Sequence, residues 1–527
     1  MSQEFAIEMR GITKCFGPVV ANNGINLQVR SGEILALLGE NGSGKTTLMN
    51  MLSGIYKPDS GSIFVNGKEA SIDSPADAKK LGIGMVHQHF KLVDVFSAAD
   101  NIWMGKTHPG IGLRKDRHEK ILEIAHKFGF ELDPYKKVYN MSVSEKQTLE
   151  IVKVLYYGAK IIVLDEPTAV LTVQEIRKLF GVLRRMKEEG HAIIIITHKL
   201  NEVKEISDRV AILRKGEYIT TVDTATTSEQ ALTEWMVGHK IDLNIDRPVV
   251  EKTRPLLEVR NLSIRNDEGA MAIDNVNFYI RGGEILGVAG IAGCGQKELC
   301  EAIAGLRPIE NGQMIHKGEN IVGLSPKTIA EKGISMSFIP EDRLGMGLAP
   351  SLSITDNMIL KNYAEGKSPF VDRKRGKVLA EEVIRELEVV TPSTETPVRR
   401  LSGGNVQKVL LGREIKAYPN VIVTAYPVRG LDIGSSYTIY NILNQQKQAG
   451  VGVLFVGEDL DVMIALCDKI MVLCHGKIMG VVHAHKTSKE ELGLMMTGAL
   501  DLTDKYEDKP AGIAKDSRFG TQDSKEV

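Results

Sequence analysis

Residues 39–47 of this chain read Gly-Glu-Asn-Gly-Ser-Gly-Lys-Thr-Thr, and the short apolar run Ile34–Leu38 leads into them. The nine residues match the pattern G-x-x-x-x-G-K-[ST], whose backbone N–H groups surround the phosphates of a nucleotide. The apolar run is typical of a buried parallel strand, and Leu48–Leu52 predicts the first turns of a helix. Glycines let the loop turn its N–H groups inward, and a helix N-terminus favours anions. The stretch therefore predicts an α/β fold with a nucleotide site between a strand and a helix.

The polar side chains of this loop have separate expected roles. Lys45 brings a cation to the β- and γ-phosphates, and Thr46 offers its hydroxyl to Mg²⁺. The alternative is a glycine-rich turn that binds nothing, but strand, Lys-Thr pair and helix occur here in the order that binding requires. The residues expected to contact the nucleotide are Gly39, Asn41, Gly42, Ser43, Gly44, Lys45, Thr46 and Thr47.

Bulk properties exclude several classes of protein. The 527 residues include 66 basic and 67 acidic ones, so no surface for a polyanion such as nucleic acid is indicated. The five cysteines have no metal-ligand spacing, which favours buried thiols in a reducing compartment. The sequence contains no signal-peptide pattern and no apolar run near the roughly 18–20 residues that a membrane span needs. Any membrane role is therefore expected to come through a partner.

The chain repeats itself in sequence. Gly32–Leu35 recurs as Gly283–Leu286 about 250 residues later, and Leu164–Pro167 corresponds to Thr424–Pro427. A period of this length indicates duplicated domains rather than a solenoid. The expected organisation is a first domain at 1–240, a linker at 241–255, a second domain at 256–500 and a disordered tail at 501–527.

Each half alternates strand-like runs with helical patterns. Continuous β-branched runs such as Ile161–Leu164 and Ile193–Ile196 suit a sheet that helices bury on both faces. Residues 73–156 are more polar and helical, and they interrupt the strand series. Each half is therefore expected to be a mixed-sheet core with an inserted helical subdomain.

Two carboxylates stand at the end of one of these strands, in the run Lys160–Thr168. Open α/β sheets place their chemistry at that edge. Asp165 is expected to hold Mg²⁺ through water, and Glu166 to polarise the water that attacks the γ-phosphate. Acids that merely cap the strand end are the alternative, which the nearby phosphate loop disfavours.

Four motifs now stand in order along the chain, and together they resemble those of an ABC ATPase: residues 39–47, Leu164–Thr168, Thr197-His198 and Leu401–Asn405. The resemblance covers roughly residues 5–500 and implies three further roles. Gln88 would touch Mg²⁺ and connect to a transmembrane partner, His198 would lie at the γ-phosphate, and Phe16 would stack on adenine. Without the resemblance, these three could be a surface glutamine, a structural histidine and a core aromatic.

The second half lacks the catalytic residue types. Gln296 and Lys297 stand where Lys45 and Thr46 stand in the first half, so the fixed cation and the metal-binding hydroxyl are gone. The remaining replacements are Ala425 for Asp165, Tyr426 for Glu166, Glu458 for His198 and, approximately, Asn266 for Phe16. We expect this pocket not to hydrolyse ATP at a useful rate.

The signature motif shows the opposite pattern. The second half keeps Leu401-Ser402-Gly403-Gly404-Asn405, whereas the first half has Met141-Ser142-Val143-Ser144-Glu145. The resemblance implies that each ATP lies between the phosphate loop of one domain and the signature of the other. Ser402, Gly403 and Gly404 would thus complete the site that contains Lys45. One competent and one degenerate site are predicted, rather than two independent ATPases.

The tandem layout is similar to that of the ATP-binding subunits of bacterial monosaccharide and nucleoside importers. Residues 84–93, 166–172 and 244–248 most resemble the nucleoside branch, which works with two permeases and a solute-binding lipoprotein. The resemblance implies ATP and Mg²⁺ as cofactors, a location on the cytoplasmic face of the cell membrane, and permease docking near Gln88 and Glu341. Alternatives are a ribose or galactose importer subunit, a soluble ATPase that remodels ribosomes, and a nucleotide sensor without turnover.

Overall fold

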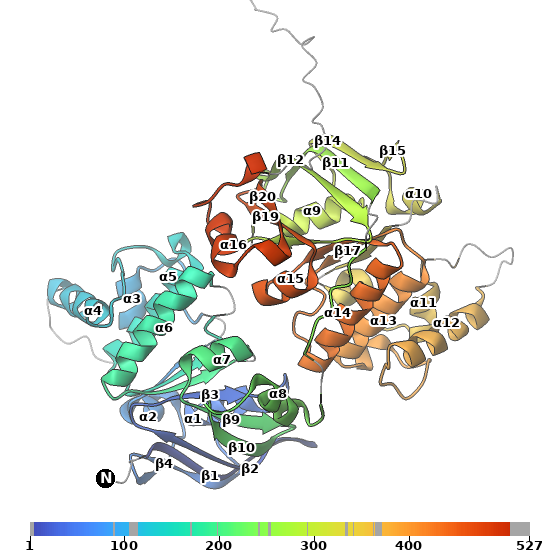
Figure 1. The fold of residues 1–527 in the computed structure, drawn as a ribbon. Coiled ribbons are helices and arrows are strands. Elements are labelled where there is room, and N and C mark those ends of the chain that lie inside the picture. The colour runs from blue at the N-terminus through green and yellow to red at the C-terminus, as the bar shows by residue number, and fades with distance from the viewer. Residues whose placement is uncertain are drawn as a thin grey trace, which may run out of the picture. The chain divides into compact units, whose positions relative to one another are not determined.

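The chain folds into two compact units, Met1–Leu243 and Asn244–Val527, each with its own sheets and helices (Figure 1). The computed structural model describes residues 5–87, 90–104, 114–168, 171–197, 199–240, 243–250, 254–291, 293–331, 336–340, 342–361, 363 and 371–505. The predicted site residues Gln88 and His198, the predicted docking residue Glu341 and residues 506–527 of the predicted tail lie outside these ranges. The first residues of that tail, 501–505, are described and include the short 3-10 helix η5 (Thr503–Lys505).

The core of the first unit is a six-stranded sheet in the order β10-β9-β3-β8-β7-β6. All neighbours in it are parallel except β9 and β10, so the sheet is mixed, as predicted. Its strands β3, β7 and β8 are buried along their whole length, which explains their continuous apolar sequence. The strands are β3 (Ile34–Leu38), β6 (Ile83–Val86), β7 (Ile161–Asp165), β8 (Ala192–Ile196), β9 (Arg209–Arg214) and β10 (Glu217–Asp223).

A second, antiparallel sheet, eight α-helices and one 3-10 helix complete the described part of this unit. The sheet has the order β2-β1-β4-β5, and the sequence analysis did not anticipate it. The predicted helical insertion at 73–156 contains β6, a strand of the core sheet, so the helical part begins after Val86. The remaining elements are β1 (Phe5–Phe16), β2 (Val19–Arg30), α1 (Lys45–Leu52), β4 (Ser60–Val65), β5 (Lys68–Ala70), α2 (Pro75–Lys80), α3 (Ala98–Trp103), α4 (Arg114–Phe128), η1 (Val138–Asn140), α5 (Val143–Tyr156), α6 (Val173–Glu188), α7 (Leu200–Ile206) and α8 (Glu229–Val237).

The second unit repeats this architecture. Its mixed sheet has the order β16-β17-β18-β13-β19-β20, and its antiparallel sheet the order β12-β11-β14-β15. The strands are β11 (Arg254–Arg265), β12 (Met271–Gly282), β13 (Ile285–Ala289), β14 (Asn311–His316), β15 (Glu319–Asn320), β16 (Met336–Ile339), β17 (Val421–Ala425), β18 (Gly452–Val456), β19 (Lys469–Cys474) and β20 (Lys477–His483).

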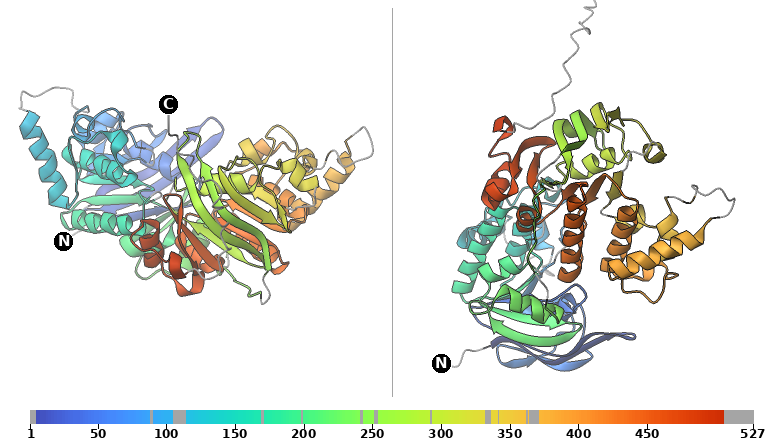
Figure 2. Two further views of the ribbon diagram at one scale, coloured as in Figure 1. Left: turned by 90° about the horizontal axis from the view of Figure 1, so that it is seen from above. Right: turned by 45° about the vertical axis from the view of Figure 1, so that its right-hand side comes forward.

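Helices cover the mixed sheet of the second unit, and three of them, α12, α13 and α14, lie side by side (Figure 2). A one-turn π-helix, η2, follows β16. The helical elements are α9 (Gln296–Ile303), α10 (Pro326–Glu331), η2 (Arg343–Gly347), α11 (Ile354–Ile359), α12 (Arg373–Glu386), η3 (Val398–Arg400), α13 (Gly403–Lys416), α14 (Ile433–Gln448), α15 (Leu460–Leu466), η4 (Ala484–Lys486), α16 (Lys489–Met496) and η5 (Thr503–Lys505).

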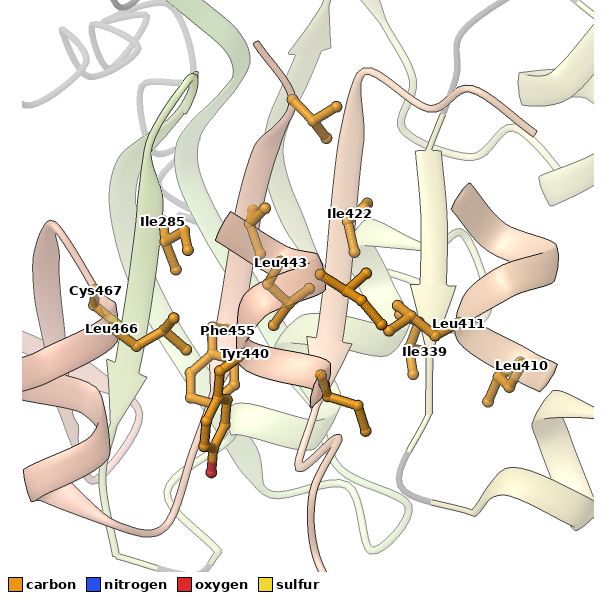
Figure 3. Packing of buried hydrophobic residues seen from close by; sticks show 14 of the residues in the cluster. Ile285, Ile339, Leu410, Leu411, Ile422, Tyr440, Leu443, Phe455, Leu466 and Cys467 are labelled. Atoms are coloured by element: carbon orange, nitrogen blue, oxygen red, sulfur yellow. The ribbon is translucent and has the colours of Figure 1, made fainter. Parts of the chain in front are cut away.

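The core of the second unit lies between its sheet and these helices. Figure 3 shows Ile285, Ile422 and Phe455 of the sheet beside Tyr440 and Leu443 of α14, and all five are buried. Burial of each large apolar side chain contributes about 1.5–3 kcal/mol. This packing fixes the strands whose ends carry the loops described below.

The segment that leads into the second unit packs on that unit. The Arg247 guanidinium donates hydrogen bonds to the carbonyl oxygens of Ile464 (3.2 Å) and Cys467 (3.0 Å). The Asn444 amide of α14 donates to the carbonyl oxygen of Asp246. Among the described residues, no helix combines the length and the apolar character that crossing a bilayer requires.

Candidate nucleotide sites

The phosphate loop of the first unit connects β3 to α1, as the sequence predicts. Gly42 and Gly44 have φ angles of 81° and 94°, which the glycines of such a loop supply without strain. A Cβ on Gly39 would lie 2.3 Å from the carbonyl oxygen of Leu213, and one on Gly44 would lie 2.3 Å from that of Ala21. Close backbone approach therefore requires glycine at both positions.

The polar residues of the loop differ in exposure. Asn41 and Thr46 are exposed and Thr47 is half-buried, whereas Ser43 is only 3% exposed. The Ser43 hydroxyl is buried without a hydrogen-bond partner among the described residues. A buried hydroxyl of this kind is costly unless a ligand supplies the partner, so its state is consistent with a binding loop.

The Lys45 ammonium is held inside the loop. Its Nζ donates to the carbonyl oxygens of Gly39 (2.7 Å) and Glu40 (2.9 Å), and the residue is 7% exposed. Burial lowers the pKa of Lys45, while the charges of Glu166 and Asp165 act against that shift. The loop thus keeps a desolvated cation next to its inward-facing backbone.

The two predicted carboxylates lie at the end of β7. The Thr46 hydroxyl approaches the Asp165 carboxylate at 3.4 Å, which brings together two of the three predicted metal ligands. Burial raises the pKa of Asp165 to about 6, and the charge of Glu166 adds to the effect. Glu166 has a φ of 47°, which a non-glycine residue rarely adopts, and its N–H donates to the Ile196 carbonyl oxygen at 2.9 Å.

The order of the strands gathers these groups. β8 lies between β3 and β7, so the ends of all three strands meet at one edge of the sheet. β8 ends at Ile196, two residues before the predicted His198 in sequence, and His198 itself lies outside the described residues. Phe16, at the end of β1, is 43% exposed and meets the ring of Tyr56 edge-on at 5.3 Å. It is therefore not a core aromatic.

The second unit keeps the shape of the loop without its cation. Gly293 and Gly295 have φ angles of 87° and 98°, close to those of Gly42 and Gly44. The Gln296 amide donates to the Ile291 carbonyl oxygen at 3.2 Å and so folds back into the loop as Lys45 does. Lys297 points outward, with its side chain 62% exposed and 3.8 Å from Glu301. A neutral amide therefore replaces the buried charge.

The carboxylate positions of the second unit are also changed. Tyr426 has a φ of 50°, so it keeps the unusual backbone of Glu166 while carrying a phenol. Glu458, at the position of His198, forms an ion pair with Arg429 at 3.2 Å. Asn266 accepts hydrogen bonds from the N–H groups of Glu268 and Ala270 and thereby caps a turn. The residues expected to be inactive here have structural contacts instead.

In the first unit, a capping box occupies the helix start that corresponds to the signature. Ser142 and Glu145 form a capping box at the start of α5, in which each side chain accepts from the other's N–H, at 3.2 and 2.7 Å. Lys136 binds the same carboxylate at 2.7 Å. The capping box already uses the N–H groups of Ser142 and Glu145, and the Glu145 carboxylate disfavours a phosphate at this helix start. The S-x-x-E pattern was visible in the sequence, and its meaning was missed.

The signature of the second unit has no such capping box in the described structure. At the start of α13, Ser402 makes no side-chain cap in the described structure, and its hydroxyl accepts from the Asn405 amide at 2.9 Å. A Cβ on Gly404 would lie 2.5 Å from the Ser435 hydroxyl, so Gly404 packs closely against α14 and a side chain there would displace Ser435. A Cβ on Gly403 would have no described neighbour nearer than 3.8 Å. Gly403 is thus not explained by contacts within its own unit.

Comparison with known proteins finds the same family in both halves of the chain. A family model described as ABC transporter matches residues 22–169 and 273–424. The nucleoside import ATP-binding protein NupA of Lactococcus lactis is 39% identical over 503 residues, covering 94% of this chain and 99% of that protein. The guanosine import ATP-binding protein NupO of Bacillus subtilis is 41% identical over 94% of this chain and 98% of that protein. A glucose import ATP-binding protein of Haloferax volcanii is 39% identical over 95% and 98%.

Proposed function

The chain belongs to the ABC transporter family, and on that basis we propose that it is the ATP-hydrolysing subunit of a nucleoside importer. The observation that carries the proposal is the contrast between the two units. One sheet edge of the first unit brings together Lys45, Thr46, Asp165 and Glu166. The second unit has a different residue type at each of the four corresponding positions. Hydrolysis is therefore assigned to the first unit.

Lys45 would bind the β- and γ-phosphates, which would replace its two carbonyl partners as acceptors. The Thr46 hydroxyl and the Asp165 carboxylate offer the oxygen ligands that Mg²⁺ prefers, and Gln88 is a further candidate. A carboxylate whose pKa is raised by burial and by Glu166 suits a site that a cation completes. Mg²⁺ would neutralise charge on the phosphates. Glu166 would orient the attacking water and accept its proton, with His198 at the γ-phosphate.

Ser402, Gly403 and Gly404 would complete this site from the second unit. Support comes from the open start of α13 and from Gly403, whose lack of a side chain has no explanation inside its unit. Gly403→Val tests the idea, because Val143 stands at the same position in the first unit. We expect the variant to fold normally and to lose most ATPase activity. Normal activity would show that the signature does not approach the nucleotide. Val143→Gly is the matched control and should change activity little.

The nucleoside assignment rests on three stretches that resemble the nucleoside branch, residues 84–93, 166–172 and 244–248, and on the two nucleoside-importing relatives. Sugar import is the second candidate, because the glucose import ATP-binding protein is 39% identical to this chain, against 39% and 41% for the two nucleoside-import relatives. In either case the partners would be two permeases and an extracytoplasmic solute-binding lipoprotein. The chain would then reside on the cytoplasmic face of the membrane.

The deciding experiment is to purify the chain with its permeases in lipid and measure ATPase stimulation by the binding protein. Binding protein loaded with a nucleoside should stimulate hydrolysis, and sugar-loaded protein should not. Stimulation by sugar alone would replace the nucleoside assignment with the second candidate. Absence of any permease partner would refute the importer proposal. Lys45→Ala is the control that must abolish activity in every case.

A further inference from the structure

Arg343 joins loops that are far apart in the sequence of the second unit. It is the first residue of η2, the π-helical turn after β16, and its guanidinium donates to the carbonyl oxygen of Arg429 in the loop after β17. Asp342 fixes the start of η2 by accepting from the N–H of Gly345 at 2.8 Å. Single π-helical turns are uncommon and occur often at functional sites.

The same guanidinium lies beside the signature. The Nη1 atom of Arg343 is 3.9 Å from the point where a Cβ on Gly403 would stand. The turn also rests on the signature helix itself, because a Cβ on Gly347 would lie 2.9 Å from a methyl group of Leu410 in α13. Arg343 therefore sits between the turn after β16, the loop after β17 and the start of α13.

The loop after β17 is itself held by charge. Arg429 pairs with Glu458 at 3.2 Å and has its guanidinium 5.8 Å from the centre of the Tyr426 ring. Further along the loop, Asp432 accepts from the N–H of Ser435 at 2.7 Å, and Ser435 is the residue against which Gly404 packs. The residues that replaced the catalytic groups thus brace the loop that supports the signature.

The first unit has a phenylalanine at the sequence position that corresponds to Arg343. Phe90 stands two residues after Gln88, as Arg343 stands two residues after Glu341. The arginine therefore occurs in the unit with the intact signature and is missing from the unit whose signature Ser142 and Glu145 have closed.

We propose that Arg343 is a positioning residue for ATP hydrolysis at the first unit's site. It holds Gly403 and the loop after β17 in the arrangement in which the signature contacts the nucleotide, and it links that arrangement to the turn after β16. The inference rests on the proposed function, in which Ser402–Gly404 complete the site. It adds that the degenerate half contributes an arginine network as well as a signature.

The test measures ATP turnover of Arg343→Ala and Arg343→Lys in the permease-containing preparation described above. Arg385→Ala is the matched control, because Arg385 is an exposed arginine of α12 in the same unit. Losing a charged hydrogen bond predicts that Arg343→Ala lowers kcat by about 10- to 100-fold. The affinity for a fluorescent ATP analogue and the thermal midpoint should match those of Arg385→Ala. Arg343→Lys should recover part of kcat, because an ammonium can still donate to the Arg429 carbonyl.

A double-mutant cycle with Ser402→Ala gives the second readout. If both residues act on one contact, the double variant should be no slower than the slower single variant. The proposal would be overturned if the fold-reductions in kcat of the two single variants multiplied in the double variant. It would also be overturned if Arg343→Ala hydrolysed ATP as fast as Arg385→Ala. If Arg343→Ala lowered the nucleotide affinity and the thermal midpoint as well as kcat, Arg343 would have a structural role only, and the proposal would be overturned. Activity that survives Lys45→Ala would instead refute the proposed function itself.

Discussion

Replacing Lys45 by glutamine would give the first unit the residue that the second unit carries as Gln296. The second unit demonstrates that glutamine fits such a loop, since Gln296 bonds back to Ile291 while the loop glycines keep the same left-handed backbone. Lys45→Gln is therefore expected to fold. Its effect should fall on the phosphates of the nucleotide rather than on the loop.

The magnitude follows from the contacts of Lys45. Its ammonium makes two charge-assisted hydrogen bonds in the free loop, at 2.7 and 2.9 Å, and two acceptors on the nucleotide would take their place. At about 1.5–3 kcal/mol each, their loss weakens ATP binding or turnover by about 10²- to 10⁴-fold. Because burial lowers the pKa of this lysine, removing it relieves an unfavourable charge. The thermal midpoint should accordingly stay within about 4 °C of the wild-type value.

The assay is titration with a fluorescent ATP analogue, followed by steady-state ATPase and thermal unfolding of the same samples. Gln296→Ala is the matched control, and it should leave turnover within about twofold, since it removes only a neutral hydrogen bond of the second loop. Two results would refute the reasoning. One is a Lys45→Gln protein that turns over ATP normally, and the other is a Gln296→Ala protein that does not.

Three further predictions follow from the same site. Glu166→Gln should bind ATP with wild-type affinity and lower kcat by at least about 10²-fold, the usual weight of a general base, and unchanged turnover would exclude Glu166 from that role. Burial raises the pKa of Asp165 to about 6, so protons compete with Mg²⁺ for this carboxylate below that pH. The Mg²⁺ concentration that gives half-maximal turnover should therefore rise about tenfold for each pH unit below that value. Because the pKa of Asp165 is raised in the folded state, the metal-free protein should lose stability as the pH rises from 3.8 to about 6, and Asp165→Asn should lack this change in stability. Phe16→Ala should weaken binding of ATP by about tenfold, measured by titration, while leaving inorganic triphosphate binding unchanged, since only the base loses a stacking partner.

Much of the fold could be predicted because its signals are local. The run Ile34–Leu38 with the glycines and Lys-Thr pair behind it indicates a strand, a loop and a helix without reference to the rest of the chain. Repetition at Gly283–Leu286 then predicts the second copy, and the mixed sheets confirm it. The antiparallel sheet of β1, β2, β4 and β5 was missed because its strands alternate between buried and exposed residues. One of its pairings, that of β1 with β4, also joins strands that are distant in sequence.

The contacts that close or open the two signatures were harder to predict. Loss of glycines in the first unit was visible, but the carboxylate of Glu145 at the helix start and its pairing with Lys136 depend on how the chain folds. Arg343 carries no local pattern at all. Its proposed role rests on its closeness to Gly403 and Arg429, which lie 60 and 86 residues further along the chain.

The backbone at the end of β17 keeps the shape of its counterpart in the first unit although the residue types differ. Tyr426 retains a φ of 50°, and its N–H donates to the Val456 carbonyl oxygen at 2.9 Å, as Glu166 does to Ile196. A left-handed non-glycine residue costs about 1–3 kcal/mol and persists only where its surroundings require it. No catalytic carboxylate remains at Tyr426 to require it. The loop that begins there continues to Arg429 and Asp432, which hold Arg343 and the packing of Gly404. We infer that the strained turn is retained because it shapes the signature that serves the other half.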